Sequence, residues 1–123
     1  MKSYKELETY RIAFELAIKV HRLCLSLPKA EQYELCSQIR RSSQSIRANI
    51  VEGYGRRKYK AEFIRSLIMA NASLLETESH LEMLNSLYDK NEISRLIKDY
   101  GELGKKLHRF IDFVQKNWKT DNQ

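Results

Sequence analysis

Histidine, carboxylate and serine side chains are the groups in this sequence that could carry out catalysis or bind a metal. A di-iron centre in a helical bundle takes its ligands from Glu-x-x-His pairs on facing helices. No histidine here has a glutamate three positions earlier: His21, His80 and His108 follow Ile18, Thr77 and Lys105 at that spacing. Glu76 and His80 are one helical turn apart, but two ligands do not make a metal site. The sequence therefore predicts no metal and no cofactor.

A catalytic interpretation of the serines and of Glu52 has little support. The serines that could act as nucleophiles are Ser42, Ser43 and Ser45. No histidine–acid pair lies near them in the sequence. Glu52 could serve as a general acid or base, but it precedes Arg56 by four residues, the orientation that stabilises a helix. We interpret Asn49, Glu52 and Arg56 as one structural polar network. We predict no catalytic residue and no enzyme activity.

Two glycines, Gly53 and Gly55, invite comparison with a phosphate-binding loop. The glycines of such loops precede a helix whose N-terminus faces the anion. Here the two glycines follow a predicted helix. We therefore interpret them as a C-terminal helix cap that uses left-handed backbone.

Cations gather in and just after the second predicted helix. Residues 31–61 carry seven basic and three acidic residues, whereas residues 62–91 carry two and five. Guanidinium and ammonium groups suit phosphate, and Tyr54 and Tyr59 could stack on exposed bases. The candidate nucleic-acid-binding residues are Arg40, Arg41, Arg47, Arg57, Lys58 and Lys60. They predict binding that is independent of base sequence and weakens steeply with salt.

The same cations allow a second interpretation. They can solvate a helix or pair with acids of a neighbouring helix or subunit, in a protein-binding scaffold that never contacts nucleic acid. The net charge of +6 fits the first interpretation without excluding the second.

Apolar periodicity predicts four helices, at about residues 4–27, 31–54, 60–88 and 92–118. The third has the clearest pattern, a heptad spacing that holds over almost four repeats from Phe63 to Tyr88. Pro28 ends the first helix because it has no amide donor. Short connections predict one all-α domain over residues 1–123, an antiparallel up-down-up-down four-helix bundle.

The first predicted helix carries two apolar stripes, which is more than one buried face requires. One stripe includes Tyr10, Phe14 and Ile18, and the other includes Leu16 and Val20. The second stripe indicates a subunit interface, and hence a homo-oligomer.

Cys24 and Cys36 each lie among apolar residues, and no CxxC spacing occurs. We expect buried, reduced thiols in a cytoplasmic protein rather than a disulfide. No apolar run is long enough to cross a membrane, and the first residues lack the apolar segment of a signal peptide.

Two long segments and the beginning of the chain carry a family resemblance. SQIRRSSQSIRANIVEGYGR and EFIRSLIMANASLLETESHLEML resemble the bacterial four-helix-bundle family encoded in intervening sequences of large-subunit ribosomal RNA genes, often labelled ribosomal-protein-like. KSYKELETYRIAFELAIKVHRL is similar to the opening helix of that family, with Tyr10 where tryptophan is common. Nearly the whole chain is covered. A related branch comprises the accessory proteins of diversity-generating retroelements.

This resemblance implies a homopentamer of helical bundles, association with nucleic acid, and no known catalysis. In the related branch the bundles also bind a reverse transcriptase. Asn49, Glu52, Gly53 and Arg56 match signature positions of the family. Arg47 departs from it, because it stands where the family often has a proline that kinks the second helix.

Overall fold

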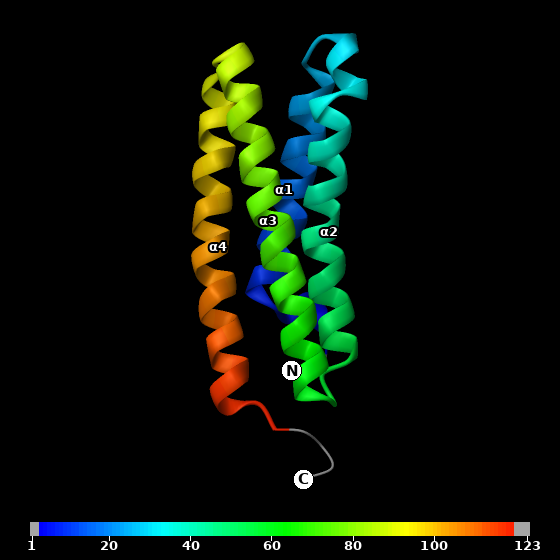
Figure 1. Cartoon of the computed structure of the whole chain (residues 1–123), viewed down its shortest axis with the longest axis vertical. Helices are drawn as coiled ribbons and strands as arrows, with labels where there is room; N and C mark the ends of the chain where they lie inside the picture. Colours follow the sequence, from blue (N-terminus) through cyan, green and yellow to red (C-terminus); the bar gives the residue numbers. More distant parts are fainter. Residues whose placement is uncertain (1–2, 120–123) are drawn as a thin grey trace.

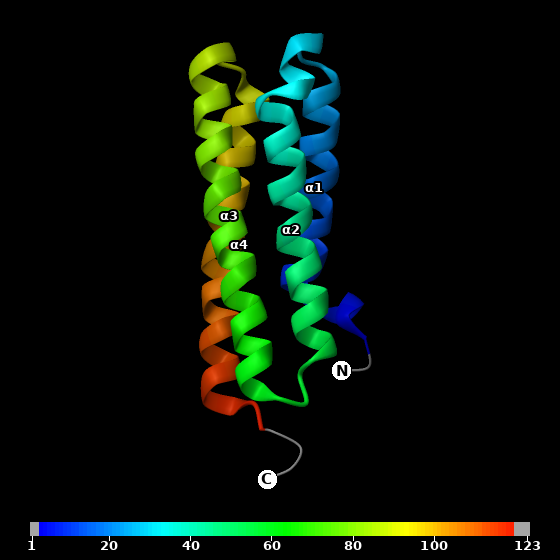
Figure 2. The same ribbon diagram turned by 45° about the vertical axis from the view of Figure 1, so that its right-hand side comes forward.

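The structure, a computed structural model, describes residues 3–119 and is helical, with no strand among those residues. It contains four α-helices, α1 (Glu8–Leu25), α2 (Leu35–Gly55), α3 (Lys60–Tyr88) and α4 (Asn91–Asn117), and two short 3-10 helices, η1 (Tyr4–Glu6) and η2 (Lys29–Tyr33). The long helices lie side by side and alternate in direction (Figure 1, Figure 2). The prediction of an all-α, antiparallel four-helix bundle is confirmed.

The observed helix bounds differ from the predicted ones mainly at the first connection. Leu7 is extended, so residues 4–6 form a separate 3-10 turn before α1. After Pro28 the chain winds as the 3-10 helix η2, and Glu34, with φ −104° and ψ −113°, separates it from α2. The predicted helix at 31–54 therefore begins at Leu35, whereas the third predicted helix has the same bounds as α3.

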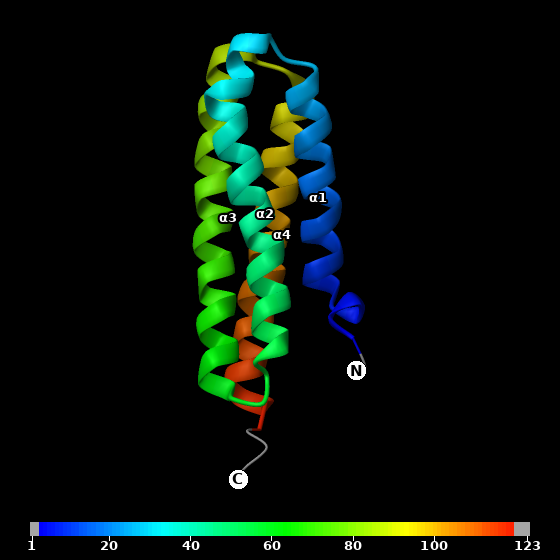
Figure 3. The same ribbon diagram turned by 90° about the vertical axis from the view of Figure 1, so that its right-hand side faces the viewer.

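Three connections and the end of α4 define the two ends of the bundle. The α2–α3 turn and the end of α4 lie together at the lower end in Figure 1, and Figure 3 shows the same arrangement. The η2 connection and the α3–α4 turn lie at the upper end. At the α3–α4 turn Asp89 adopts left-handed backbone with φ 46°, a conformation that aspartate tolerates better than most residues. Its amide donates to the Asn85 carbonyl at 2.8 Å, which closes the last turn of α3.

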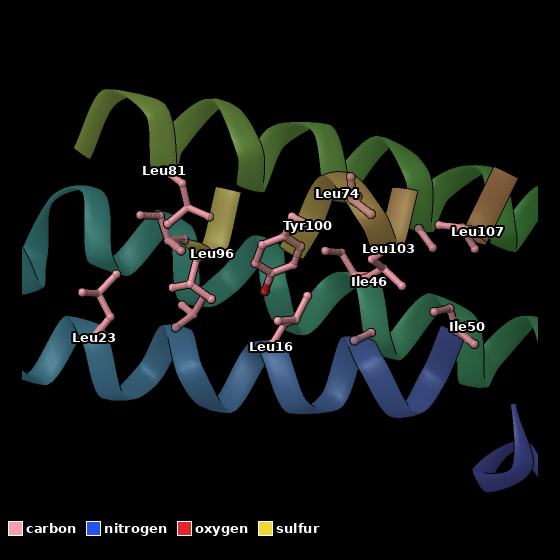
Figure 4. Close-up of a cluster of buried hydrophobic side chains, with 14 of the residues drawn as sticks. Leu16, Leu23, Ile46, Ile50, Leu74, Leu81, Leu96, Tyr100, Leu103 and Leu107 are labelled. Carbon is pink, nitrogen blue, oxygen red and sulfur yellow. The ribbon is translucent and has the colours of Figure 1, made fainter. Parts of the chain in front are cut away.

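Leucine, isoleucine and aromatic side chains from all four long helices fill the core (Figure 4). Tyr100 on α4 lies among them and is fully buried, and its hydroxyl has no hydrogen-bond partner within residues 3–119. Burial raises the pKa of this phenol above its ordinary value.

Small hydroxyl-bearing side chains join α2 to α3 alongside the apolar core. The Thr77 hydroxyl donates to Ser42 Oγ at 2.7 Å, and Ser45 Oγ lies 2.8 Å from Ser73 Oγ. These short side chains satisfy one another's hydrogen bonds, so the two helices can approach closely without leaving buried polar atoms unpaired.

The predicted cap at Gly53 and Gly55 is wrong. No glycine within residues 3–119 has positive φ, and both glycines belong to α2. A Cβ atom at Gly53 would lie 2.9 Å from Ser66 Cβ on α3, so the close approach of two helices requires glycine there. Gly55 has nothing within 4 Å of such an atom. The helix is capped instead by Arg56, whose amide donates back to carbonyls of the last turn.

The rest of the chain covers one stripe of α1 and leaves part of the other exposed. Leu16 and Val20 are buried, whereas Phe14 keeps 44% and Ile18 keeps 39% of its surface exposed. The uncovered stripe faces outward on the α1 side of the bundle.

None of the helices in the described part of the chain combines the length and apolarity needed to cross a membrane.

Candidate nucleic-acid interface

The structure divides the six candidate cations into two groups. Arg40, Arg41 and Arg47 belong to α2, whereas Arg57, Lys58 and Lys60 lie at the turn between α2 and α3. At a rise of 1.5 Å per residue, the two groups are separated by up to about 25 Å along the bundle. The candidates therefore do not form a single patch.

Arg40 is half-buried, and its guanidinium is directed toward η2. Its Nη1 donates to Gln32 Oε1 at 2.9 Å, and its Nη2 donates to the Gln32 carbonyl at 3.0 Å. The Gln32 amide in turn donates to the Cys24 carbonyl at the end of α1. Arg40 thus connects α2 to the preceding turn, and this position leaves little of its guanidinium for a phosphate.

The thiols of Cys24 and Cys36 lie beneath this arginine. Both are fully buried and free. Burial, followed by the hydrogen bond to the Cys36 thiol, raises the pKa of Cys24 from 9.0 to about 12. Both therefore remain protonated at neutral pH.

Arg41 and Arg47 remain available at the surface to different degrees. Arg41 is exposed and forms no ion pair within residues 3–119. Arg47 donates from Nε and Nη2 to Gln44 Oε1 at 3.1 and 2.8 Å, a contact within one helix. It also borders a shallow pocket between α1 and α2, together with Phe14 and Arg22.

At the α2–α3 turn the two candidate tyrosines have different environments. Tyr54 is 5% exposed, and the Arg57 guanidinium covers its ring at 3.9 Å from the centroid. Tyr54 therefore cannot stack on a base. Tyr59 is 52% exposed, and the Lys58 ammonium lies 5.9 Å from its ring centroid. Lys58 is exposed and Lys60 is half-buried.

The end of α4 joins this turn, which the sequence interpretation did not foresee. Trp118 Nε1 donates to the Arg57 carbonyl at 3.0 Å, and the indole packs edge-on against Phe63 at 5.1 Å between ring centroids. Lys119 follows as an exposed cation. The apolar spacing of the fourth predicted helix already included Trp118, but nothing in the sequence indicated a partner 61 residues earlier.

The predicted polar network consists of two separate groups. Asn49 Nδ2 donates to the carbonyl and hydroxyl of Ser45, at 2.9 and 3.1 Å, and so joins the α2–α3 hydroxyl contacts. Glu52 instead pairs with Arg56 at 3.0 Å, and Arg56 lies 4.0 Å from Glu62 at the start of α3. Asn49 belongs to the first group because its amide points toward the preceding turn of α2.

Carboxylates pair with few of the cations in residues 3–119, whether these lie inside or outside the candidate set. Ion pairs involve the following cations: Arg56, Arg65, Lys105, Lys106 and Lys116. Five of the candidates have no such pair within residues 3–119, namely Arg40, Arg41, Arg47, Arg57 and Lys58.

Metal-binding side chains do not gather in the described part of the chain. No group of three histidine, cysteine or carboxylate side chains is placed to hold an ion there. His80 Nε2 lies 3.3 Å from Glu76 Oε2, the one-turn pair noted in the sequence.

Comparison with known proteins gives a family and a fold relative. Residues 5–109 match the family model described as 23S rRNA-intervening sequence protein. A crystal structure of a protein of unknown function of the S23 ribosomal protein family, from Bacteroides thetaiotaomicron VPI-5482, superposes with a TM-score of 0.75 at 27% identity. The superposition covers 84% of this chain and 97% of that one. A search of curated proteins found no match. Because the family model spans most of the chain, the protein belongs to the 23S rRNA-intervening sequence protein family.

Proposed function

We propose that this protein binds nucleic acid without sequence preference and without catalysis, through cations of α2 and of the α2–α3 turn. The observation that carries the proposal is that Arg41, Arg47 and Lys58 have no carboxylate partner within the described residues and lie in residues 31–61, where seven basic residues outnumber three acidic ones. Such cations can replace the counterions of a phosphate backbone, and counterion release supplies most of the free energy of non-specific binding. A nucleic-acid partner and two reduced thiols suit a cytoplasmic role.

Fluorescence anisotropy with a labelled nucleic acid of mixed sequence, titrated with salt, tests the proposal. We expect tight binding at low salt and a linear fall of log K with log salt concentration. Arg41→Glu combined with Lys58→Glu should weaken binding by at least about tenfold, since each reversal removes a phosphate contact and adds repulsion.

A matched control separates location from net charge. Lys90→Glu combined with Lys98→Glu changes net charge by the same amount, at exposed positions beside and on α4, the helix that α2 does not contact. Equal weakening by both double variants would mean that overall charge, not these cations, attracts the nucleic acid. No binding at low salt would remove the proposal.

We also propose that the protein is a homo-oligomer, for which the family resemblance implies five copies. The uncovered stripe of α1 supports this, because Phe14 and Ile18 lie beside a pocket that α1 and α2 share. Light scattering should give a mass well above the 14.6 kDa of one chain, and Phe14→Glu should lower it. A mass of one chain for the unaltered protein would refute self-association.

The outer face of α3 favours a second candidate function, a protein-binding scaffold for a partner such as a reverse transcriptase. Its exposed apolar side chains are Ile68, Met69, Leu75, Met83 and Leu87. In that case partner capture should remain insensitive to salt after charge reversal on α2. Leu75→Lys should abolish partner capture.

A further inference from the structure

The lower end of the bundle holds an exposed aromatic ring between two cations. Tyr59 keeps 52% of its surface exposed, the largest exposed fraction of any aromatic side chain at this end. Lys58 and Lys60 flank it in the sequence, and both follow the basic pair Arg56-Arg57. The views in Figures 1 and 2 place this turn beside the end of α4.

Contacts from three helices fix the backbone of this turn. The Arg57 carbonyl accepts from Trp118 at the end of α4, and the Arg57 guanidinium donates to the Tyr54 carbonyl at 2.9 Å. The Tyr59 amide donates to the Arg56 carbonyl at 2.9 Å, and the Tyr59 carbonyl accepts from Phe63 in the first turn of α3. The ring of Tyr59 is thus presented from an ordered backbone, which lowers the entropy that a ligand must remove.

The carboxylates close to this turn in sequence are themselves paired. Glu52 lies 3.0 Å from the Arg56 guanidinium, and Glu62 lies 4.0 Å from that of Arg56 and 3.9 Å from that of Arg65, so two arginines balance two carboxylates. Lys58 and Lys119 add exposed positive charge around the turn.

We propose that this end of the bundle binds single-stranded nucleic acid, with one unpaired base stacked on Tyr59 and the adjacent phosphates against Lys58 and Lys60. The inference rests on the proposed function and names the form of nucleic acid that the site selects. An exposed π-face with neighbouring cations is the arrangement that binds single strands without sequence preference. In a duplex the faces of the bases are stacked on one another, so Tyr59 would have no base to contact.

In this arrangement Arg57 and Trp118 are positioning residues. The indole holds the Arg57 carbonyl, and the guanidinium covers Tyr54, so neither side chain needs to contact the ligand. Trp118 is the one tryptophan in the sequence, so its emission reports on ligands at this end.

The test compares a short labelled single strand of mixed sequence with the same strand annealed to its complement. Tyr59→Ala should lower the affinity for the single strand by roughly 5- to 150-fold, the effect of losing one base–aromatic stack. The affinity for the duplex should be unchanged. Tyr59→Phe should retain single-strand affinity because it keeps the ring. Tyr33→Ala is the matched control, since Tyr33 is 79% exposed at the other end of the bundle and should have no effect. Single-strand binding should also quench Trp118.

The outcomes separate this inference from the function on which it rests. If both probes bind and Tyr59→Ala weakens neither, or weakens both equally, single-strand stacking is overturned and nucleic-acid binding stands. If neither probe binds at low salt, the proposed function fails and this inference fails with it. Circular dichroism of Tyr59→Ala should show that the helices persist in this variant.

Discussion

The two ends of the bundle contain similar residues and use them differently. At the upper end, Arg40 donates to Gln32 and lies over two buried thiols, and the Tyr88 hydroxyl donates to Glu31 Oε1 at 2.9 Å. At the lower end, Lys58 and Tyr59 extend into solvent.

The contrast shows that a cation near a connection has no fixed role. Where the connection folds back as a 3-10 helix, its carbonyl groups need donors, and a nearby arginine supplies one. Where the helix is capped by its own backbone and by Trp118, the cations remain available to a ligand. Four measurements test this contrast.

Replacing Arg40 should have the largest effect on folding. Arg40→Ala removes two charged hydrogen bonds from a half-buried site, so the free energy of unfolding should fall by about 2–3 kcal/mol in urea titrations. Lys58→Ala should change it by less than about 0.5 kcal/mol, because its side chain is exposed. Affinity for nucleic acid should show the reverse order. Equal losses of stability in the two variants would contradict the contrast.

Replacing Gly53 and Gly55, the two glycines at the lower end of α2, by alanine should change stability in opposite directions. Gly53→Ala should destabilise the fold by about 1–2 kcal/mol, because the new methyl would meet Ser66 Cβ at 2.9 Å. Gly55→Ala meets nothing within 4 Å and should stabilise by up to about 1 kcal/mol, the gain in helix propensity. Thermal unfolding followed by circular dichroism measures both. A neutral Gly53→Ala would mean that α2 and α3 can separate without cost.

Trp118→Phe should have a smaller effect, confined to the lower end. The variant loses the donor to the Arg57 carbonyl but keeps an aromatic ring against Phe63, so the cost should be about 0.5–1.5 kcal/mol. Hydrogen exchange should speed up at the amides of residues 56–60 and remain unchanged around η2. Faster exchange at both ends would contradict a local role for Trp118.

Raising the pH into the alkaline range should lower the free energy of unfolding through groups at the upper end. Near neutral pH these groups should have no such effect. The Cys24 thiol has a pKa raised from 9.0 to about 12, so the folded chain holds this proton more tightly than the unfolded chain does. This contribution to stability is complete below pH 9.0 and is lost as the pH rises toward about 12. The hydrogen bond to Glu31 raises the pKa of Tyr88 and acts in the same direction. Urea titrations across this range should show a shallower fall for Cys24→Ala than for the unaltered protein. A parallel fall would assign the loss to other groups.

Much of the fold was predictable because helix periodicity is a local property. The stripe from Phe63 to Tyr88 gave the bounds of α3, since its heptad spacing admits one buried face. The division of α1 into a buried and an uncovered stripe was visible as two apolar stripes. The break at Glu34 was not predictable, because helical spacing continues through residues that a 3-10 turn occupies.

The candidate site was predictable only as a set of residue types. The sequence places cations and tyrosines near residue 57, but Tyr54 and Tyr59 look equivalent in it. Burial separates them, because Arg57 and the core cover one ring and solvent surrounds the other.

The helical class, the family and the excess of positive charge in residues 31–61 all follow from the order of residue types along the chain. Three other roles become visible only in the folded bundle: Arg40 supports η2, Gly53 admits α3, and Trp118 holds the turn that precedes Tyr59. Each of these roles depends on a partner distant in sequence or on another element, and periodicity carries no information about which distant groups will meet.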